Sequence, residues 1–218
     1  MDSQFWHRRW REGRIGWHLG QVNPWLEKYW AKLAQPPGAR VFVPLCGKSL
    51  DMRWLSDRGY QVLGVELSGT AVRAFCEEQG LTAQATQEGR HLRHSAGSIE
   101  LLEGDFFHLE PEQLAGVKAV WDRAALVALP ESLRRDYVRH LAGLLEPGTR
   151  MLLVTMEYPQ GEMQGPPFSV PEEEVRTRFS PFFQVELLER QDMLADNPAL
   201  RERGLSRLLE QAWRLRRL

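Results

Sequence analysis

Residues 41–68 read VFVPLCGKSLDMRWLSDRGYQVLGVELS, and this stretch decides the fold. It begins and ends with a short apolar run, and the segment between the runs has the apolar spacing of a helix that stops at Gly59. Short apolar runs bounded in this way are typical of strands buried on both faces of a parallel sheet. A strand, a helix and a second strand in succession therefore predict an α/β protein.

The turn after the first run contains Gly47-Lys48-Ser49, which also end the phosphate-binding P-loop of many nucleotide hydrolases. A P-loop has the form G-x-x-x-x-G-K-[ST], and its first glycine supplies the open backbone that wraps phosphates. Phe42 occupies that first position, inside the predicted strand. The sequence therefore argues against a nucleotide triphosphatase.

An acidic residue, Glu66, ends the second apolar run, about twenty residues after the glycine turn. In doubly wound sheets an acid at this place accepts hydrogen bonds from the ribose hydroxyls of an adenosine cofactor. The dinucleotide fingerprint G-x-G-x-x-G is absent, because Leu45, Cys46 and Lys48 stand where a pyrophosphate would need glycines. S-adenosylmethionine carries no phosphate, so the turn favours this methyl donor over NAD.

The alternation of strands and helices continues beyond residue 68, which favours a parallel sheet with helices on both faces. Residues 159–171 form a predicted loop that is long enough to act as a lid, and RHLRH at 90–94 indicates an exposed loop. The apolar spacing of residues 205–218, taken alone, favours a helix. The predicted strands are 39–45, 60–67, 98–107, 117–126 and 149–158, and the predicted helices are 2–13, 23–35, 48–59, 68–80 and 130–148.

The composition argues against several classes of protein. The chain has 218 residues, of which 43% are hydrophobic and 26% charged, as in a globular protein with one full core. Its 28 basic and 29 acidic residues nearly balance, which argues against a nucleic-acid or anionic membrane partner. No apolar run reaches the roughly 20 residues of a membrane helix, and no signal peptide is recognisable, so we expect a cytoplasmic protein.

Five segments of the sequence resemble the thiopurine S-methyltransferase family, in particular its bacterial members. The resemblance extends from about Trp6 to the end of the chain, and PLCGK in place of a glycine-rich turn is unusual among methyltransferases. The segments are WHRRW at 6–10, VPLCGKSLDM at 43–52, DRGYQVLGVELS at 57–68, WDRAALVAL at 121–129 and GPPFSVP at 165–171.

The resemblance implies the Rossmann-like fold of class I S-adenosylmethionine-dependent methyltransferases. This fold has a seven-stranded, mostly parallel sheet whose last strand is antiparallel, so part of residues 205–218 is expected to be that strand and not a helix. We expect a single domain over residues 1–218. Within it, residues 1–38 would form an N-terminal helical cap over the active site, and residues 39–218 the Rossmann-like core with its lid-like loop.

The implied activity is methyl transfer from S-adenosylmethionine to thiopurines or other aromatic and heterocyclic thiols, with S-adenosylhomocysteine as product. Bacterial relatives are also linked to methylation of selenium and tellurium compounds, and hence to tellurite resistance. The expected partner is a small thiol or chalcogen acceptor, with no nucleic acid or membrane bound, and a monomer is expected.

The resemblance also implies the site residues. The aromatic face of Trp10 would attract the sulfonium cation of the donor, although the alternative role of Trp10 is to pack against the sheet as a core residue. Trp17 would stack on a planar acceptor. Arg123 would contact both ligands and orient the acceptor or stabilise its thiolate, and no general base and no metal are assigned. The cofactor-binding set is Trp10, Leu45, Gly47, Glu66, Asp105 and Arg123.

Two other functions fit the same layout. One is an NAD-dependent oxidoreductase on a Rossmann-like fold, which the missing glycines disfavour. The other is a non-catalytic adenosine-binding module, which the N-terminal tryptophans and the Gly-Pro-Pro loop argue against, because both segments suit closure over a second ligand. The two cysteines, Cys46 and Cys76, lack metal-ligand spacing and are expected to be small buried thiols.

Overall fold

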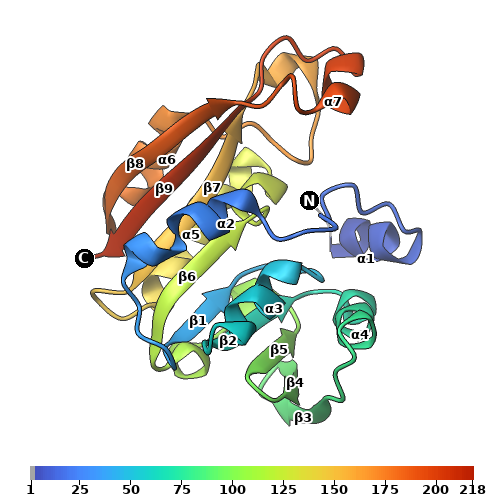
Figure 1. Cartoon of the computed structure of the whole chain (residues 1–218), viewed down its shortest axis with the longest axis vertical. Coiled ribbons are helices and arrows are strands. Elements are labelled where there is room, and N and C mark those ends of the chain that lie inside the picture. Colours follow the sequence, from blue (N-terminus) through green and yellow to red (C-terminus); the bar gives the residue numbers. More distant parts are fainter. Residues whose placement is uncertain (1–2) are drawn as a thin grey trace. The chain divides into compact units, whose positions relative to one another are not determined.

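Residues 3–218 are described by a computed structural model, in which the chain divides into two units, Met1–Trp121 and Asp122–Leu218 (Figure 1). Asp2, the first residue of the predicted helix over 2–13, lies outside the described residues. The helices are α1 Ser3–Arg11, α2 Pro24–Tyr29, α3 Leu50–Asp57, α4 Gly69–Glu78, α5 Glu131–Leu144, α6 Glu172–Phe179 and α7 Pro198–Glu202, with short 3-10 helices η1 Trp30–Leu33, η2 Phe106–His108, η3 Pro111–Leu114, η4 Leu126–Ala128 and η5 Gln160–Glu162.

The first unit contains a sheet with the strand order β3-β4-β5-β2-β1-β6, and β6 runs on into the second unit. Strands β5, β2, β1 and β6 pair in parallel, and β1, β2 and β5 are seen side by side in Figure 1. This parallel pairing confirms the predicted α/β class. The strands are β1 Arg40–Val43, β2 Gln61–Glu66, β3 Gln84–Glu88, β4 His91–Ala96, β5 Ile99–Glu103 and β6 Val117–Arg123.

Local sequence signals explain where the first helices begin. The side chain of Asn23 accepts a hydrogen bond from the backbone N–H of Trp25, and Pro24 occupies the first helical position of α2. Ser49 caps α3 in the same way by accepting from the N–H of Asp51 at 3.2 Å. Both helices were predicted at these places. The predicted strand over 39–45 is confirmed as β1.

A hairpin of β3 and β4 was not predicted. The structure has nine strands between residues 3 and 218, two more than the expected seven, and these two are the extra pair. The expectation of an exposed loop at RHLRH was wrong, because β4 begins at His91, whose side chain is fully buried. The two strands turn at Gly89-Arg90 and carry few apolar residues, so hydrophobic spacing gave no signal for them.

The second unit has a three-stranded antiparallel sheet in the order β7-β9-β8, which is clear in Figure 1. The last strand in the sequence, β9, therefore lies between the two that precede it. This confirms the strand that the family resemblance implied within 205–218, and the helix favoured by apolar spacing is wrong. The strands are β7 Arg150–Glu157, β8 Phe183–Asp192 and β9 Leu209–Arg217.

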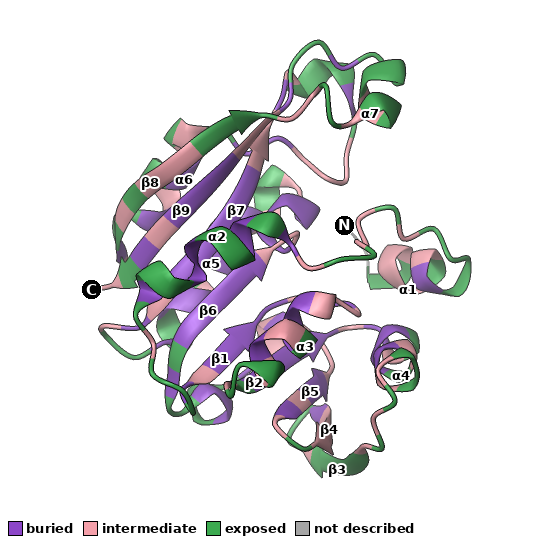
Figure 2. Cartoon of the chain, in the orientation of Figure 1, coloured by how far each residue is buried: buried purple, intermediate pink, exposed green. Residues whose placement is uncertain are grey.

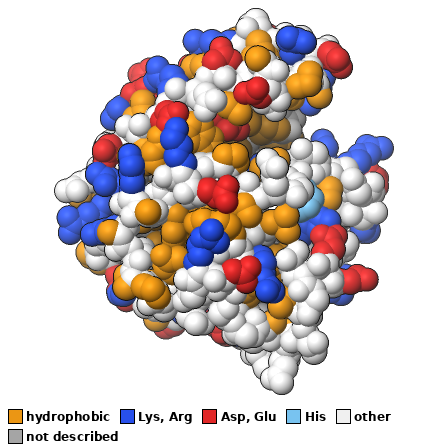
Figure 3. All heavy atoms as spheres, viewed as in Figure 1, with side chains coloured by type: hydrophobic (Ala, Val, Ile, Leu, Met, Phe, Trp, Pro, Cys, Tyr) orange, Lys and Arg blue, Asp and Glu red, His pale blue; other side chains and the backbone are white. Residues whose placement is uncertain are grey.

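The central strands of each unit contribute most to its hydrophobic core. Figure 2 shows β1 and β6 of the first unit, and β7 and β9 of the second, as largely buried. The face drawn in Figure 3 carries both basic and acidic side chains at its surface, in keeping with the net charge of −1. Within residues 3–218, every helix is too short or too polar to cross a membrane.

The predicted loop at 159–171 is held by hydrogen bonds within the second unit. The hydroxyl of Tyr158 donates to the carbonyl of Pro167 at 2.6 Å. The carboxylate of Glu162 accepts from both the backbone N–H and the hydroxyl of Ser206, at 2.8 and 2.7 Å. These contacts tie the loop to the segment before β9, and its action as a lid stays a prediction.

Candidate active site

The turn between β1 and α3 takes a backbone shape that few residues adopt. Leu45 and Gly47 have φ values of 46° and 55°, in the left-handed region. The backbone N–H of Cys46 donates to the carbonyl of Val65 in β2 at 2.9 Å, which joins the turn to the neighbouring strand. The turn therefore bends sharply at the carboxyl ends of β1 and β2. In open α/β sheets, ligands bind at this edge.

Glu66 closes the same edge from β2. One oxygen of its carboxylate accepts from the N–H of Gly47 at 2.9 Å, and the other accepts from the N–H of Ser68 at 2.8 Å. The side chain is only 6% exposed. Burial raises the pKa of Glu66 to about 7, although the hydrogen bonds from Ser68, Gly47 and Leu67 act in the opposite direction. Near neutral pH this carboxyl group therefore changes its charge readily.

Two tryptophans from the N-terminal segment converge on the glycine turn. A Cβ atom built on Gly47 would lie 3.2 Å from the ring of Trp10, so glycine allows the indole to lie directly against the turn. Trp10 is 8% exposed, and Trp17 meets it edge to face with 5.9 Å between the ring centroids. Trp6 packs on the other side of Trp17 at 5.2 Å. Trp6, Trp10 and Trp17 thus form one aromatic wall beside Gly47, which lies thirty or more residues further along the sequence.

Asp105 lies on the loop after β5, next to Glu66. Glu66 and Glu103 are partners in the parallel register of β2 and β5, and the N–H of Gly104 donates to the Glu66 carbonyl at 2.9 Å. The carboxylate of Asp105 accepts from the N–H of Phe107 at 2.9 Å and caps the short helix η2. The structure therefore brings together five of the predicted cofactor-binding residues, Trp10, Leu45, Gly47, Glu66 and Asp105, along with Trp17.

Arg123 is the last residue of β6 and belongs to the second unit, so its relation to these residues stays a prediction. It is followed by Ala124, which has a left-handed φ of 64°. Its neighbour Asp122 is fully buried, accepts from the Tyr137 hydroxyl at 2.6 Å and accepts from the N–H of Leu126 at 3.3 Å. Burial raises the pKa of Asp122 to about 6. Asp122 thus fixes the turn that follows Arg123.

Residues that suggested other chemistry have structural roles. The Lys48 ammonium forms an ion pair with Glu78 at 2.5 Å, in contrast to a P-loop lysine, which binds phosphate. Cys46 is buried as expected, whereas Cys76 is partly exposed, and both are free thiols. Burial raises the pKa of the Cys46 thiol well above its ordinary value. No group of three or more His, Cys, Asp and Glu side chains that could hold a metal occurs among residues 3–218.

Sequence reasoning missed one residue that organises the N-terminal segment. Asp51 is buried, and its carboxylate accepts from the N–H of Asn23 at 2.8 Å and from the indole N–H of Trp121 at 2.9 Å. It thereby fastens the segment before α2 to α3 and β6 within the first unit. Asp51 occupies the first turn of an amphipathic helix, where an acid usually faces solvent, so spacing gave no signal. His91 was missed because hydrophobic spacing gave no signal for strand β4.

Comparison with known proteins identifies relatives over the whole length. Residues 1–218 match the family described as Thiopurine S-methyltransferase (TPMT). A thiopurine S-methyltransferase of Methylococcus capsulatus is 50% identical over 217 residues, which cover 99% of this chain and 98% of the relative. One from Pseudomonas fluorescens is 47% identical over 216 residues and covers 99% of each chain.

Solved methyltransferases share the fold. The 1,6-didemethyltoxoflavin-N1-methyltransferase of Burkholderia thailandensis, with its substrate and S-adenosylhomocysteine bound, matches with a TM-score of 0.62 and 16% identity, and covers 97% of this chain and 86% of that chain. This likeness shows the Rossmann-like fold alone. The full-length match and the 47–50% identity show more: the chain belongs to the thiopurine S-methyltransferase family.

Proposed function

We propose that the site transfers the methyl group of S-adenosylmethionine to the sulfur of a thiopurine or another aromatic or heterocyclic thiol. The observation that carries this proposal is the buried carboxylate of Glu66 at the end of β2, held against the Gly47 turn in a chain of this family. When bound, S-adenosylmethionine supplies an electrophilic methyl group on a sulfonium sulfur, and S-adenosylhomocysteine leaves after the transfer.

The residues present fit a nucleoside without phosphates. Backbone N–H groups of Gly47, Ser68 and Leu67 hold the Glu66 carboxylate, and a carboxylate has about four lone-pair sites, which leaves one that suits a ribose hydroxyl. The turn that carries Leu45 and Gly47 exposes backbone toward the donor. Asp105 lies on the next loop along the sheet edge, where its carboxylate would accept from the adenine amino group. Glu66 would therefore hold the sugar, and Asp105 the base.

The aromatic wall of Trp6, Trp10 and Trp17 suits both reactants, the positively charged donor and the planar acceptor. Trp10 lies against Gly47, and its ring face would stabilise the donor sulfonium by about 0.5–2 kcal/mol. Trp17 packs edge to face on Trp10, so it would stack on a planar acceptor beside the donor. Alignment of the two reactants is a large part of the rate in such displacements.

Arg123 is the residue to which we assign a catalytic role. Its guanidinium would orient the acceptor and stabilise a thiolate, whose sulfur attacks the methyl carbon while the bond to the sulfonium sulfur breaks. Aromatic and heterocyclic thiols are acidic enough to ionise near neutral pH, so the reaction requires no general base from the chain. Burial commits Asp122 to Tyr137 and to the turn, which makes it a structural partner of Arg123.

The proposal also covers further acceptors, the cellular compartment and the oligomeric state. Selenium and tellurium compounds are soft nucleophiles like thiolates, so we include them among the acceptors, with tellurite resistance as a consequence. A cytoplasmic monomer that binds neither nucleic acid nor membrane completes the proposal, with support from the balanced charge. Light scattering after gel filtration tests the monomer directly.

Two assays test the proposed function. Calorimetry should give binding of S-adenosylhomocysteine and none of NAD, which separates the methyltransferase from an oxidoreductase. Transfer of a labelled methyl group to 6-mercaptopurine, with selenite as a second acceptor, should then separate an enzyme from a non-catalytic adenosine-binding module. Binding of S-adenosylhomocysteine without transfer to any thiol would contradict the proposal.

A further inference from the structure

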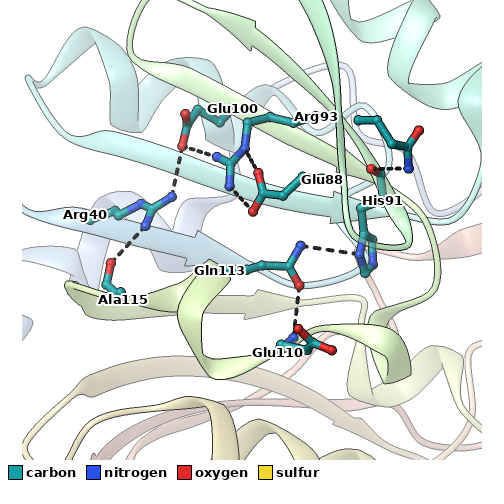
Figure 4. Close-up of polar contacts among 9 residues, drawn as sticks. Arg40, Glu88, His91, Arg93, Glu100, Glu110, Gln113 and Ala115 are labelled. Atoms are coloured by element: carbon teal, nitrogen blue, oxygen red, sulfur yellow. Dashed lines mark hydrogen bonds and ion pairs between the residues drawn. The ribbon is translucent and has the colours of Figure 1, made fainter.

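His91, the first residue of β4, lies in a polar network of the first unit that the proposed reaction does not use (Figure 4). Its side chain is fully buried. Its Nε2 lies 3.0 Å from the carbonyl oxygen of Asp105, and its Nδ1 lies 3.4 Å from Nε2 of Gln113. The imidazole therefore bridges η3 and the loop after β5. A buried polar ring with both nitrogens engaged holds its neighbours in one arrangement.

The network fixes which nitrogen of His91 carries the proton. The N–H of Glu110 donates to Oε1 of Gln113 at 3.0 Å, as part of a capping box at η3. The amide oxygen of Gln113 is thereby committed, so its NH₂ group points toward Nδ1 of His91, as Figure 4 shows. Nδ1 must accept, and Nε2–H must donate to the Asp105 carbonyl. The capping box thus makes Nε2–H of His91 the donor to the Asp105 loop.

The loop after β5 is shaped to receive this histidine. A Cβ atom on Gly104 would lie 2.4 Å from the His91 ring, so only glycine lets the imidazole approach. The same glycine donates its N–H to the carbonyl of Glu66 at 2.9 Å. The backbone from 104 to 105 is therefore held from one side by Glu66 and from the other by His91. That backbone sets the direction in which the carboxylate of Asp105 points.

We propose that His91 is a positioning residue for adenine recognition: by donating to the Asp105 carbonyl, it holds the Asp105 carboxylate where the 6-amino group of the donor's adenine binds. This inference rests on the proposed function, since it takes Asp105 as the acceptor for that amino group. The capping box of η3 then has a function beyond helix stability, because it selects the tautomer.

Two substitutions test the roles of the two ring nitrogens of His91 separately. In a buried site the amide nitrogen of glutamine reaches the place of Nε2, and that of asparagine the place of Nδ1. His91→Gln should therefore keep the hydrogen bond to Asp105, and His91→Asn should lose it. The measurement is the dissociation constant, by calorimetry, of S-adenosylhomocysteine and of its analogue with hydrogen in place of the 6-amino group.

The wild-type protein should bind S-adenosylhomocysteine about 10-fold or more tightly than the analogue, the effect of one hydrogen bond to a carboxylate. His91→Asn should reduce this preference to that of Asp105→Ala, and the double variant should show no further loss. His91→Gln should retain most of it. His94→Asn is the matched control on the same strand, since His94 pairs with Glu103, and it should keep the full preference.

The possible failures can be told apart. If wild type does not distinguish the two ligands, Asp105 does not bind the amino group, and both the role of Asp105 and this inference are wrong. If folded His91→Asn keeps the wild-type preference, only the role of His91 is wrong. Should His91→Asn fail to fold, nitrogen NMR of the wild-type imidazole decides, because a proton on Nδ1 would overturn the assigned tautomer.

Discussion

Replacing Glu66 with glutamine should remove a pH dependence of donor binding that the wild-type protein is expected to show. Burial raises the pKa of Glu66 from 4.5 to about 7, so the carboxyl group without ligand is largely protonated below pH 7. Ribose hydroxyls that donate to Glu66 favour the charged form, because a protonated carboxyl already uses one oxygen as a donor. Binding of S-adenosylhomocysteine should therefore strengthen as pH rises.

The magnitude follows from the charged fraction of Glu66. With a pKa of about 7, this fraction is about 9% at pH 6 and about 91% at pH 8, and the apparent dissociation constant varies inversely with it. Affinity should thus rise about 10-fold between these two values, or by about 1.4 kcal/mol. In the Glu66→Gln side chain an NH₂ group replaces one oxygen, so that, like the hydroxyl of the protonated acid, it offers a donor where the carboxylate accepts from backbone N–H groups. Its affinity should not vary with pH and should be no higher than that of wild type at pH 5.5.

Calorimetry of S-adenosylhomocysteine at pH 5.5, 6.5, 7.5 and 8.5 measures this dependence. Titrations in two buffers of different ionisation enthalpy should also show release of a proton from wild type near pH 6, and none from Glu66→Gln. Asp122→Asn removes the other buried carboxyl group with a raised pKa and should leave the midpoint near 7. A flat wild-type affinity over this range, with no proton released, would refute the assignment of Glu66 to the ribose.

Four further outcomes are expected. Gly47→Ala should cost about 1–2 kcal/mol of unfolding free energy in urea for the left-handed backbone alone, and more than the matched Gly80→Ala, whose new Cβ meets nothing within 4 Å. Arg123→Lys should lower turnover about 10²–10³-fold, and full activity would show that planarity is irrelevant. Trp17→Ala should raise the KM for the thiol acceptor and leave the dissociation constant of S-adenosylhomocysteine unchanged; equal loss of both would place Trp17 at the donor. The unfolding free energy of wild type, measured relative to Asp122→Asn in denaturation experiments, should fall by up to about 3 kcal/mol between pH 4 and 7. The reason is that the pKa of Asp122 is higher in the native state than in the unfolded state, so the native state loses its proton at a higher pH. A difference that stays constant with pH would contradict the raised pKa.

The sequence was sufficient where a local signal and the fold agree. Asn23 followed by Pro24 predicts the start of α2, and the acid after an apolar strand predicts Glu66 at the ligand edge. Local chemistry fixes both, because a cap and a strand end depend on neighbouring residues. The residues that converge from a distance, such as Trp10 on Gly47, were predicted only through the family resemblance.

Hydrophobic spacing gave wrong predictions in two places, the β3–β4 hairpin with its polar contacts and strand β9, which lies between two other strands. In the β3–β4 hairpin, Arg93 of β4 forms ion pairs with Glu88 of β3 and with Glu100 of the neighbouring β5, and Arg40 of β1 reaches the same Glu100 (Figure 4). Spacing rules do not count such pairs. Strand β9 has three consecutive buried residues, Gln211, Ala212 and Trp213, so both of its faces are covered there and its apolar pattern does not alternate.

The position of β9 between β7 and β8 has a consequence for biosynthesis. Both β7 and β8 precede β9 in the chain, so each has an open edge until β9 pairs with it. Edges of this kind invite pairing with another nascent chain, and the non-local contacts that cover them form slowly. Substitutions in β9 should therefore reduce the yield of native protein through aggregation during folding, before they alter the finished enzyme.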